Sequence, residues 1–168
     1  MENYKHKLNH IKAFVFDVDG VLTNGQLLIT EKGELLRSMN VKDGFALKNA
    51  LQKGYKICII SGGNNPGVEK RLANLGVQKI FMNVKDKMTC LDEFVSHENL
   101  DLEHVAFMGD DLPDYHVMQK SGLAVAPQDA VPEIKKIADY VSHLSGGNAC
   151  VRDLIRQVLS VQENWFKP

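Results

Sequence analysis

The sequence lacks any apolar run long enough to cross a bilayer, and it has no surplus of charge of one sign. Because the formal net charge is −1, electrostatics give no reason to expect nucleic acid or a membrane surface as a partner. Residues 1–12 are polar and do not contain the hydrophobic segment of a signal peptide. The three cysteines are scattered without metal or redox spacing, and the six histidines show no ligand spacing. We therefore expect a reduced, cytoplasmic protein that binds neither membranes nor nucleic acid.

Internal repeats, low-complexity segments and linkers are also missing, so the chain predicts a single domain over residues 1–168. This length is enough to bury a substantial core, and a hydrophobic content of 44% is typical of a globular protein. Short apolar runs alternate with helical patterns, which favours an α/β fold with a central parallel sheet and right-handed crossovers. Asp43 is expected to cap the first of the main helices. Strands are expected near residues 14–16, 56–60, 80, 104–108 and 123–126, and helices near 43–51, 66–75, 88–97, after 113 and from 132.

A β-hairpin is predicted at about residues 25–40, between the first strand and the first of these helices. Two short apolar segments, 26–30 and 34–39, flank a charged turn at 31–33. The insertion is too small to form a separate cap domain. Because isolated hairpins are only marginally stable, its apolar side chains are expected to pack on a second subunit or on its own domain.

Two carboxylates follow the first predicted strand. Residues 14–16 form a short apolar run typical of a buried strand, and Asp17 and Asp19 lie where it ends. In open α/β sheets, ligands bind beyond the carboxyl ends of the strands. Because burying an unpaired carboxylate is costly, this pair indicates a site for a cation, a proton or a phosphoryl group. Taken alone, the pair is equally consistent with a capped turn, since Asp is common in turns.

A second acidic cluster favours the functional interpretation. The apolar run 105–108 ends at a glycine that is followed by Asp110 and Asp111, and Asp114 comes one helical turn later. Carboxylates gathered at two strand ends repel one another unless a divalent cation neutralises them. Because these ligands are hard oxygens rather than His or Cys, Mg²⁺ fits better than zinc or copper. The two clusters predict a magnesium-dependent phosphoryl-transfer site.

A hydroxyl and a lysine lie between the two clusters. The apolar run 56–60 is followed by Ser61 and Gly62, whose hydroxyl and backbone N–H groups suit phosphoryl oxygens. Lys87 stands just before a helical pattern, where a lysine balances acidic charge and binds a transferring phosphate. Each signal is weak by itself, because turn-forming loops and surface lysines are common.

Together these segments resemble a known family. The motifs Asp17-Val18-Asp19-Gly20, Ser61-Gly62, Lys87 and Gly109-Asp110-Asp111 with Asp114 are similar, in order and spacing, to the four motifs of the haloacid dehalogenase (HAD) superfamily. The resemblance covers nearly the whole chain. Within the superfamily the chain looks like the small phosphatases of sugar acids, such as those of 3-deoxy-D-manno-octulosonate (KDO) 8-phosphate. This subgroup resemblance rests on residues 17–23, 40–44, 146–147 and 151–152.

The resemblance implies a Rossmann-like three-layer fold with a hairpin in place of a cap, Mg²⁺ as cofactor, and hydrolysis of KDO 8-phosphate in lipopolysaccharide biosynthesis. It implies that Asp17 is a nucleophile that forms an aspartyl-phosphate and that Asp19 is the acid–base residue. It also implies a magnesium ion held by Asp17, Asp110 and the backbone carbonyl of Asp19, and a homotetramer assembled through the hairpins. Ser61 and the N–H groups near Gly20 and Gly62 are implied to bind the phosphate, and Lys87 to balance its charge. Asp111 and Asp114 are implied to orient a metal-bound water and Lys87.

Two positions depart from the octulosonate phosphatase pattern. Those enzymes usually carry Gly-Arg after the second-motif hydroxyl, where this chain has Gly62-Gly63-Asn64, and they carry arginine in place of Lys42. Only arginine offers a planar fork to a carboxylate. Related substrates, such as deoxynononate 9-phosphate and N-acetylneuraminate 9-phosphate, therefore stay open. The candidate substrate-binding residues are Lys42, Gly63, Asn64 and Arg71.

Two rival functions fit parts of the pattern. A response-regulator receiver domain also uses Mg²⁺, an aspartate, a hydroxyl and a lysine, but its phosphorylated Asp lies mid-chain and it has no counterpart of Asp19. A catalytically silent binding protein could share the fold, since fold does not imply function. The presence of every predicted catalytic side chain favours a phosphatase, and the missing cap domain favours a phosphatase over a mutase.

Overall fold

The central sheet is built from short apolar strands that are buried on both faces. In β1 (Ala13–Phe16), Phe14 and Phe16 pack into one hydrophobic cluster, whereas Ala13 and Val15 pack into another, as the twofold alternation of a strand requires. The computed structural model describes residues 4–166 and has a six-stranded parallel sheet of order β5-β4-β1-β6-β7-β8. The remaining strands of this sheet are β4 (Lys56–Ile60), β5 (Lys79–Phe81), β6 (Val105–Met108), β7 (Leu123–Ala126) and β8 (Tyr140–Val141).

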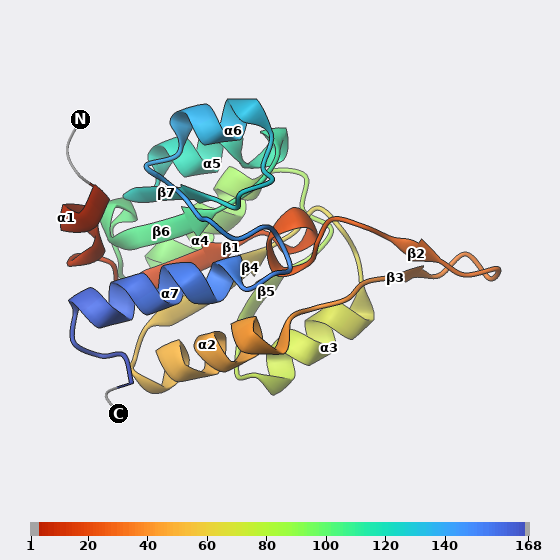
Figure 1. The fold of residues 1–168 in the computed structure, drawn as a ribbon, viewed down its shortest axis with the longest axis horizontal. Helices are drawn as coiled ribbons and strands as arrows, with labels where there is room; N and C mark the ends of the chain where they lie inside the picture. The colour runs from red at the N-terminus through yellow and green to blue at the C-terminus, as the bar shows by residue number, and fades with distance from the viewer. Residues whose placement is uncertain (1–3, 167–168) are drawn as a thin grey trace.

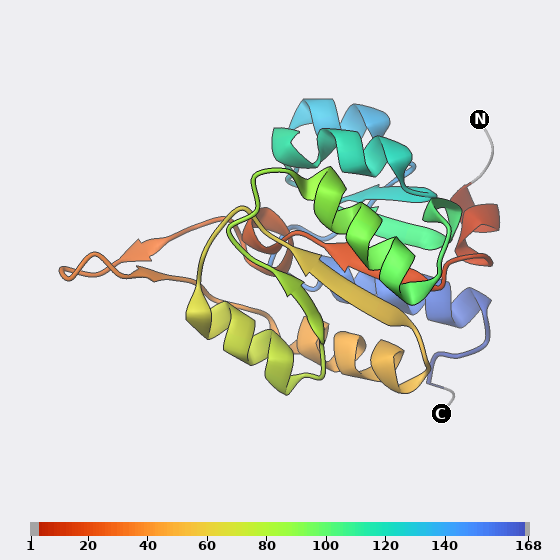
Figure 2. The same ribbon diagram turned by 180° about the vertical axis from the view of Figure 1, so that it is seen from behind.

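Helices cover both faces of the sheet (Figures 1 and 2). One face packs against α2, α3 and α7, and the other against α4, α5 and α6. This arrangement confirms the predicted three-layer α/β fold with a parallel sheet. Within residues 4–166, no helix is both long enough and apolar enough to cross a membrane. The helices are α1 (Tyr4–Leu8), α2 (Val41–Gln52), α3 (Pro66–Asn74), α4 (Lys87–Glu98), α5 (Tyr115–Lys120), α6 (Pro132–Ile137) and α7 (Cys150–Val161).

The hairpin projects away from the rest of the chain, as both views of the ribbon show (Figures 1 and 2). Its strands β2 (Leu28–Ile29) and β3 (Leu35–Leu36) are antiparallel and shorter than the predicted segments 26–30 and 34–39. Leu28 and Ile29 are 68% and 65% exposed. The hairpin tip therefore does not pack on its own domain. Of the two predicted alternatives, packing on a second subunit remains for the tip.

One predicted cap is wrong, and three helices or strands are additional. Asn40, not Asp43, caps α2 by accepting the N–H of Lys42. Asp43 is instead buried in the first turn of α2. The helices α1 and α7 and the strand β8 were not expected from the sequence. Predictions for residues 1–3 and 167–168, which belong to the polar amino-terminal segment and to the single domain over 1–168, lie outside the described residues.

Candidate active site

Three strand ends bring the candidate residues together at the carboxyl edge of the sheet. Phe16 of β1 pairs with Ile59 of β4 and with Met108 of β6, so the residues that follow these strands meet. This edge opens into a cavity of about 440 Å³. The cavity is lined by Asp17, Asp19, Ser61, Gly62, Gly63, Lys87, Asp110 and Asp111, which were all predicted, and by Gly25, Val84, Lys85 and Pro113.

Asp17 is buried beside Lys87, the first residue of α4. Nζ of Lys87 lies 3.0 Å from Oδ1 of Asp17 and 2.7 Å from Oδ1 of Asp114. Asp86, the N-cap of α4, fixes the start of the helix that carries this lysine. Oδ2 of Asp114 also accepts the N–H of Asp110 at 3.1 Å. Lys87 and Asp114 therefore link the ends of β1 and β6 to the start of α4, and the predicted orientation of Lys87 by Asp114 stays a prediction.

Burial raises the pKa of two carboxyl groups in this cluster. The pKa of Asp17 rises to about 7, through burial first and the charge of Asp114 second, while Lys87 opposes the rise. The pKa of Asp110 also rises to about 7, through burial and then the charges of Asp17 and Asp114. Burial by itself would lower the pKa of Lys87. The neighbouring carboxylates of Asp17 and Asp114 together have the larger effect, so the pKa of the lysine is raised. The cluster thus holds more acid than Lys87 neutralises.

The turn after β1 depends on Gly20. Its φ of 85° lies in the left-handed region that glycine tolerates best. A Cβ atom at this position would overlap the carboxylate of Asp110, so glycine leaves room for that side chain beside the turn. The N–H of Gly20 donates to Oγ1 of Thr23 at 3.3 Å. The predicted contact of this N–H with phosphate stays a prediction.

Arg37 contacts the carboxylate of Asp19, a partner that the sequence analysis did not single out. Its Nε lies 2.7 Å from Oδ1 of Asp19, and its Nη2 lies 3.0 Å from Oδ2. The Arg37 side chain is only 6% exposed. No motif marks this arginine, because the contact exists only once the hairpin returns past the end of β1.

Ser61 follows β4 and is buried. Its Oγ accepts the N–H of Gly63 at 3.1 Å, which leaves the hydroxyl hydrogen free to donate to an anion in the cavity. Asp111 is exposed and accepts the N–H of Leu112 at 2.7 Å, so its predicted role with a metal-bound water stays a prediction.

Three of the candidate substrate-binding residues lie outside the cavity lining. Lys42, Asn64 and Arg71 are all exposed, and Arg71 lines a neighbouring hollow together with Arg37. Gly63, the fourth, does line the catalytic cavity. Contacts of all four with a substrate stay predictions.

The acidic cluster fits a magnesium ion. Carboxylate oxygens of Asp17, Asp110 and Asp114 all lie within 4.8 Å of one another. Asp114 is already engaged by Lys87 and by the N–H of Asp110, so Asp17 and Asp110 are the carboxylates available to a cation. Hard oxygen ligands of this kind are the environment that Mg²⁺ prefers. The participation of the Asp19 carbonyl stays a prediction.

Two glycines late in the chain close over the turn after β1. The N–H of Gly147 donates to the carbonyl of Val21 at 2.9 Å. The carbonyl of Gly147 accepts a hydrogen bond from Nδ2 of Asn40 at 3.1 Å. A Cβ atom on Gly146 would overlap the carbonyl oxygen of Gly20, so a side chain has no room there. The start of α2, this loop and the turn after β1 therefore form one packed unit.

Asp43 of α2 caps α7 from outside. Ala149, which precedes α7, has a φ of 72° and supplies no capping side chain. Oδ1 of Asp43 accepts the N–H of Arg152 at 2.8 Å in its place. Burial raises the pKa of Asp43 to about 6, and the backbone N–H groups of Arg152 and Ala149 oppose the rise. The segments 40–44 and 146–152, on which the subgroup resemblance rests, thus contact each other.

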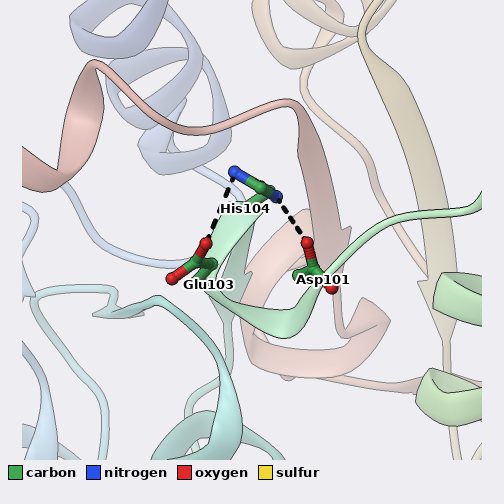
Figure 3. Close-up of side chains that lie close together, drawn as sticks. All are labelled: Asp101, Glu103 and His104. Atoms are coloured by element: carbon green, nitrogen blue, oxygen red, sulfur yellow. Dashed lines mark ion pairs between the residues drawn. The ribbon is translucent and has the colours of Figure 1, made fainter.

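A second group of potential ligands lies at the opposite edge of the sheet, before β6 (Figure 3). Nδ1 of His104 lies 3.7 Å from Oδ2 of Asp101, and Nε2 of the same ring lies 3.7 Å from Oε1 of Glu103. The two carboxylates approach different nitrogens of the ring, and both Asp101 and Glu103 are exposed to solvent. We interpret this group as a surface ion-pair cluster.

The aspartates after β1 and β6, the serine after β4 and the lysine of α4 all line one cavity, which is the arrangement of a HAD-like hydrolase. The family model for haloacid dehalogenase-like hydrolases matches residues 79–149. The 3-deoxy-D-manno-octulosonate 8-phosphate phosphatase of Salmonella typhi is 36% identical, covering 93% of this chain and 83% of its own length. The chain belongs to the family of 3-deoxy-D-manno-octulosonate 8-phosphate phosphatases.

Solved structures agree with this assignment. The enzyme of that name from Yersinia pestis matches with a TM-score of 0.94 and 31% identity, covering 97% of this chain and 88% of that one. The Moraxella catarrhalis enzyme, solved with a magnesium ion, a phosphate ion and KDO, matches with a TM-score of 0.93 and 32% identity. That match covers 98% of this chain and 94% of the other.

Proposed function

We propose that the chain is a magnesium-dependent phosphomonoesterase that converts KDO 8-phosphate into KDO and inorganic phosphate, a step of lipopolysaccharide biosynthesis. The similarity to enzymes of this name extends over most of the chain. A relative from Moraxella catarrhalis was solved with magnesium, phosphate and KDO. Asp17 and Asp110, with the carbonyl of Asp19, would hold Mg²⁺, which supplies positive charge opposite the phosphoryl oxygens.

The proposed reaction proceeds through two displacements at phosphorus. Asp17 attacks the phosphorus atom, the bond from phosphorus to the sugar oxygen breaks, and Asp19 gives that oxygen a proton. A water molecule then attacks the aspartyl-phosphate and passes a proton to Asp19, and the bond from phosphorus to Asp17 breaks. Ser61 and Lys87 bind the phosphoryl oxygens in both displacements.

The observation that carries this proposal is the placement of Asp17 in the cavity, 3.0 Å from Nζ of Lys87. Its test is phosphate release with and without Mg²⁺ from a panel of sugar phosphates, comparing the wild type with Asp17→Asn. We expect strong Mg²⁺-dependent turnover of one sugar acid phosphate by the wild type and none by the variant. Turnover of no member of the panel by a folded, Mg²⁺-binding protein would remove the phosphatase function and leave a binding role.

The same panel tests the substrate. Gly63 and Lys42 depart from the pattern of the octulosonate phosphatases, which favours including deoxynononate 9-phosphate and N-acetylneuraminate 9-phosphate beside KDO 8-phosphate. Simple hexose phosphates serve as controls without a carboxylate. Equal, slow turnover of all compounds would keep the chemistry and reject the specificity.

We further propose that the chain forms a homotetramer through its hairpins. Support comes from the exposed apolar residues that gather on the hairpin, Leu27, Leu28, Ile29, Leu35 and Leu36, which are 41–68% exposed. Such a patch on a projecting hairpin is typical of a protein–protein contact. The expected partner is a second copy of this chain.

Charges placed on the hairpin should break this assembly. Leu28 and Leu36 are cross-strand partners, so we expect Leu28→Glu with Leu36→Glu to convert the tetramer into smaller species in sedimentation velocity. Leu112→Glu, at a residue that is 56% exposed and lies outside the hairpin, is the matched control and should leave the mass unchanged. A wild type that sediments as a monomer would refute the assembly.

We also propose that the chain acts as one domain in the cytoplasm. Its three cysteines, Cys58, Cys90 and Cys150, are all free, which agrees with a reducing compartment. The sheet and its two helical layers account for both hydrophobic clusters of residues 4–166.

A further inference from the structure

We propose that Arg37 is a positioning residue for Asp19, and that the hairpin is thereby part of the catalytic apparatus. This inference rests on the proposed function, in which Asp19 exchanges protons with the leaving oxygen and with water. Arg37 is not among the residues that line the catalytic cavity, whereas Asp19 is. The arginine therefore acts through the carboxylate that it holds.

The contact has the geometry that fixes a carboxylate in one orientation. Nε and Nη2 of Arg37 each donate to a different oxygen of Asp19, at 2.7 Å and 3.0 Å. A planar guanidinium that binds both oxygens restricts rotation of the carboxylate more than a single contact does. The arginine side chain is 6% exposed and the Asp19 side chain 36% exposed, so one face of the carboxylate is covered while another faces the cavity.

The hairpin stem positions the guanidinium. Arg37 directly follows β3, and its Nη1 donates to the carbonyl of Leu35 at 3.0 Å. The same carbonyl accepts Nδ2 of Asn65 at 2.9 Å, and Asn65 caps α3. The stem is thus tied to the loop after β4 on one side and to Asp19 on the other.

Gly63 leaves the room that this contact requires. A Cβ atom on Gly63 would lie 3.1 Å from Oδ2 of Asp19 and 3.3 Å from Nη2 of Arg37, closer than ordinary contacts allow. The guanidinium of Arg37, which comes from the hairpin, occupies the space beside Gly63.

The first test compares Arg37→Ala and Arg37→Lys with Lys32→Ala, which removes a charge from the exposed turn of the same hairpin. With the sugar acid phosphate that the wild type turns over fastest, we expect Arg37→Ala to lower kcat at least about tenfold with little change in KM. Arg37→Lys should recover only part of the loss, because an ammonium group cannot bind both oxygens in one plane. Lys32→Ala should match the wild type.

A leaving-group comparison separates positioning of Asp19 from a general loss of structure. Nitrophenolate departs without needing a proton, whereas a sugar alkoxide needs one. In single-turnover experiments, aspartyl-phosphate formation by Arg37→Ala should therefore slow much less with p-nitrophenyl phosphate than with the sugar phosphate. Added guanidinium ion should partly restore the sugar phosphate reaction, and urea at the same concentration should not.

A double-mutant cycle tests the role of Gly63. Gly63→Ala should lower kcat in the wild type but have little further effect in the Arg37→Ala background, because the contact that it crowds is already absent. Equal slowing with both leaving groups, or wild-type kcat in Arg37→Ala, would overturn the inference while leaving the proposed phosphatase function intact. Failure of the wild type to hydrolyse any sugar phosphate would instead overturn the proposed function.

Discussion

Lys87 is the single residue on which the acidic cluster depends most. Its ammonium group lies between Asp17 and Asp114, and its side chain is only 5% exposed. A buried charge pair adds little net stability, but removal of one partner leaves the other charge uncompensated. The lysine is therefore a structural requirement as well as a proposed phosphate ligand.

We expect Lys87→Met to lower the free energy of unfolding by about 3–5 kcal/mol, because the variant leaves two buried carboxylates without their cation. Urea denaturation measures this change, and phosphate release should be lost in the same variant. Lys85→Met, an exposed lysine on the same cavity, is the matched control and should change stability by less than about 0.5 kcal/mol. A Lys87→Met variant as stable as the control would contradict this account.

Among single residues, those that belong to contiguous motifs could be identified as site residues from the sequence. Asp17, Ser61 and Asp110 each follow an apolar run, so their meeting at one sheet edge follows from strand order alone. Arg37 could not be predicted, because its contact with Asp19 joins positions 18 apart through the path of a hairpin. Nothing in the local pattern distinguishes it from a solvated surface arginine.

At the scale of elements, the contact between α2 and α7 is the least expected feature. Asp43 has the position of a helix-start residue, but the prediction that it caps α2 is wrong. It caps α7, and Asn40 caps α2. A pattern of residues can identify a capping side chain without showing which helix it serves.

Asp43→Ala should destabilise the chain by about 1–2 kcal/mol, because the N–H of Arg152 at the start of α7 loses its acceptor. Urea denaturation, with helix content followed by circular dichroism, measures the change. Asp92→Ala, on an exposed position of α4, removes the same charge without a cap and should have little effect. Equal destabilisation by the two substitutions would argue against capping between helices.

The elements themselves were predicted with uneven success for physical reasons. β4 and β6 are continuous apolar runs bounded by turn signals, and such runs are easily recognised. β8 has two residues, too few for any periodicity. α7 carries the helical spacing of Val151, Leu154, Ile155 and Val158 on its buried face, a signal that could have located it.

At the scale of the whole molecule, the raised pKa values link stability to pH. Asp17 and Asp110 have pKa values of about 7 in the folded chain, whereas a free Asp titrates near about 4. The folded state therefore holds these protons more tightly than the unfolded state does. The associated stability is complete below about pH 4 and is lost as the pH rises through about 7.

We expect the melting temperature of the metal-free protein to fall between about pH 5 and pH 8, and Mg²⁺ to raise it more at the higher pH. Mg²⁺ binding requires the deprotonated carboxylates, so it opposes the loss that their deprotonation causes. Calorimetry with and without Mg²⁺ measures both effects, and Asp110→Asn should reduce the shift caused by Mg²⁺. A Mg²⁺ shift that is the same at both pH values would contradict the proposed ligands.

The layered fold could be predicted because alternation of strands and helices leaves few other arrangements. The closure of residues 146–152 over the turn after β1 could not be predicted, since no pattern in either segment identifies the other as its neighbour. The resemblance to a subgroup singled out both segments, and the structure supplies the reason in their direct contact.

This closure also has a consequence for the order in which a ribosome releases the chain. Asp17 is synthesised early, yet β1 pairs with β6, and the loop at Gly146 and Gly147 covers the turn beyond it. During synthesis, Asp17 is therefore made long before the surfaces that hold it in place. The turn beyond β1 reaches its observed packing only after residues 146–147 have been added to the chain.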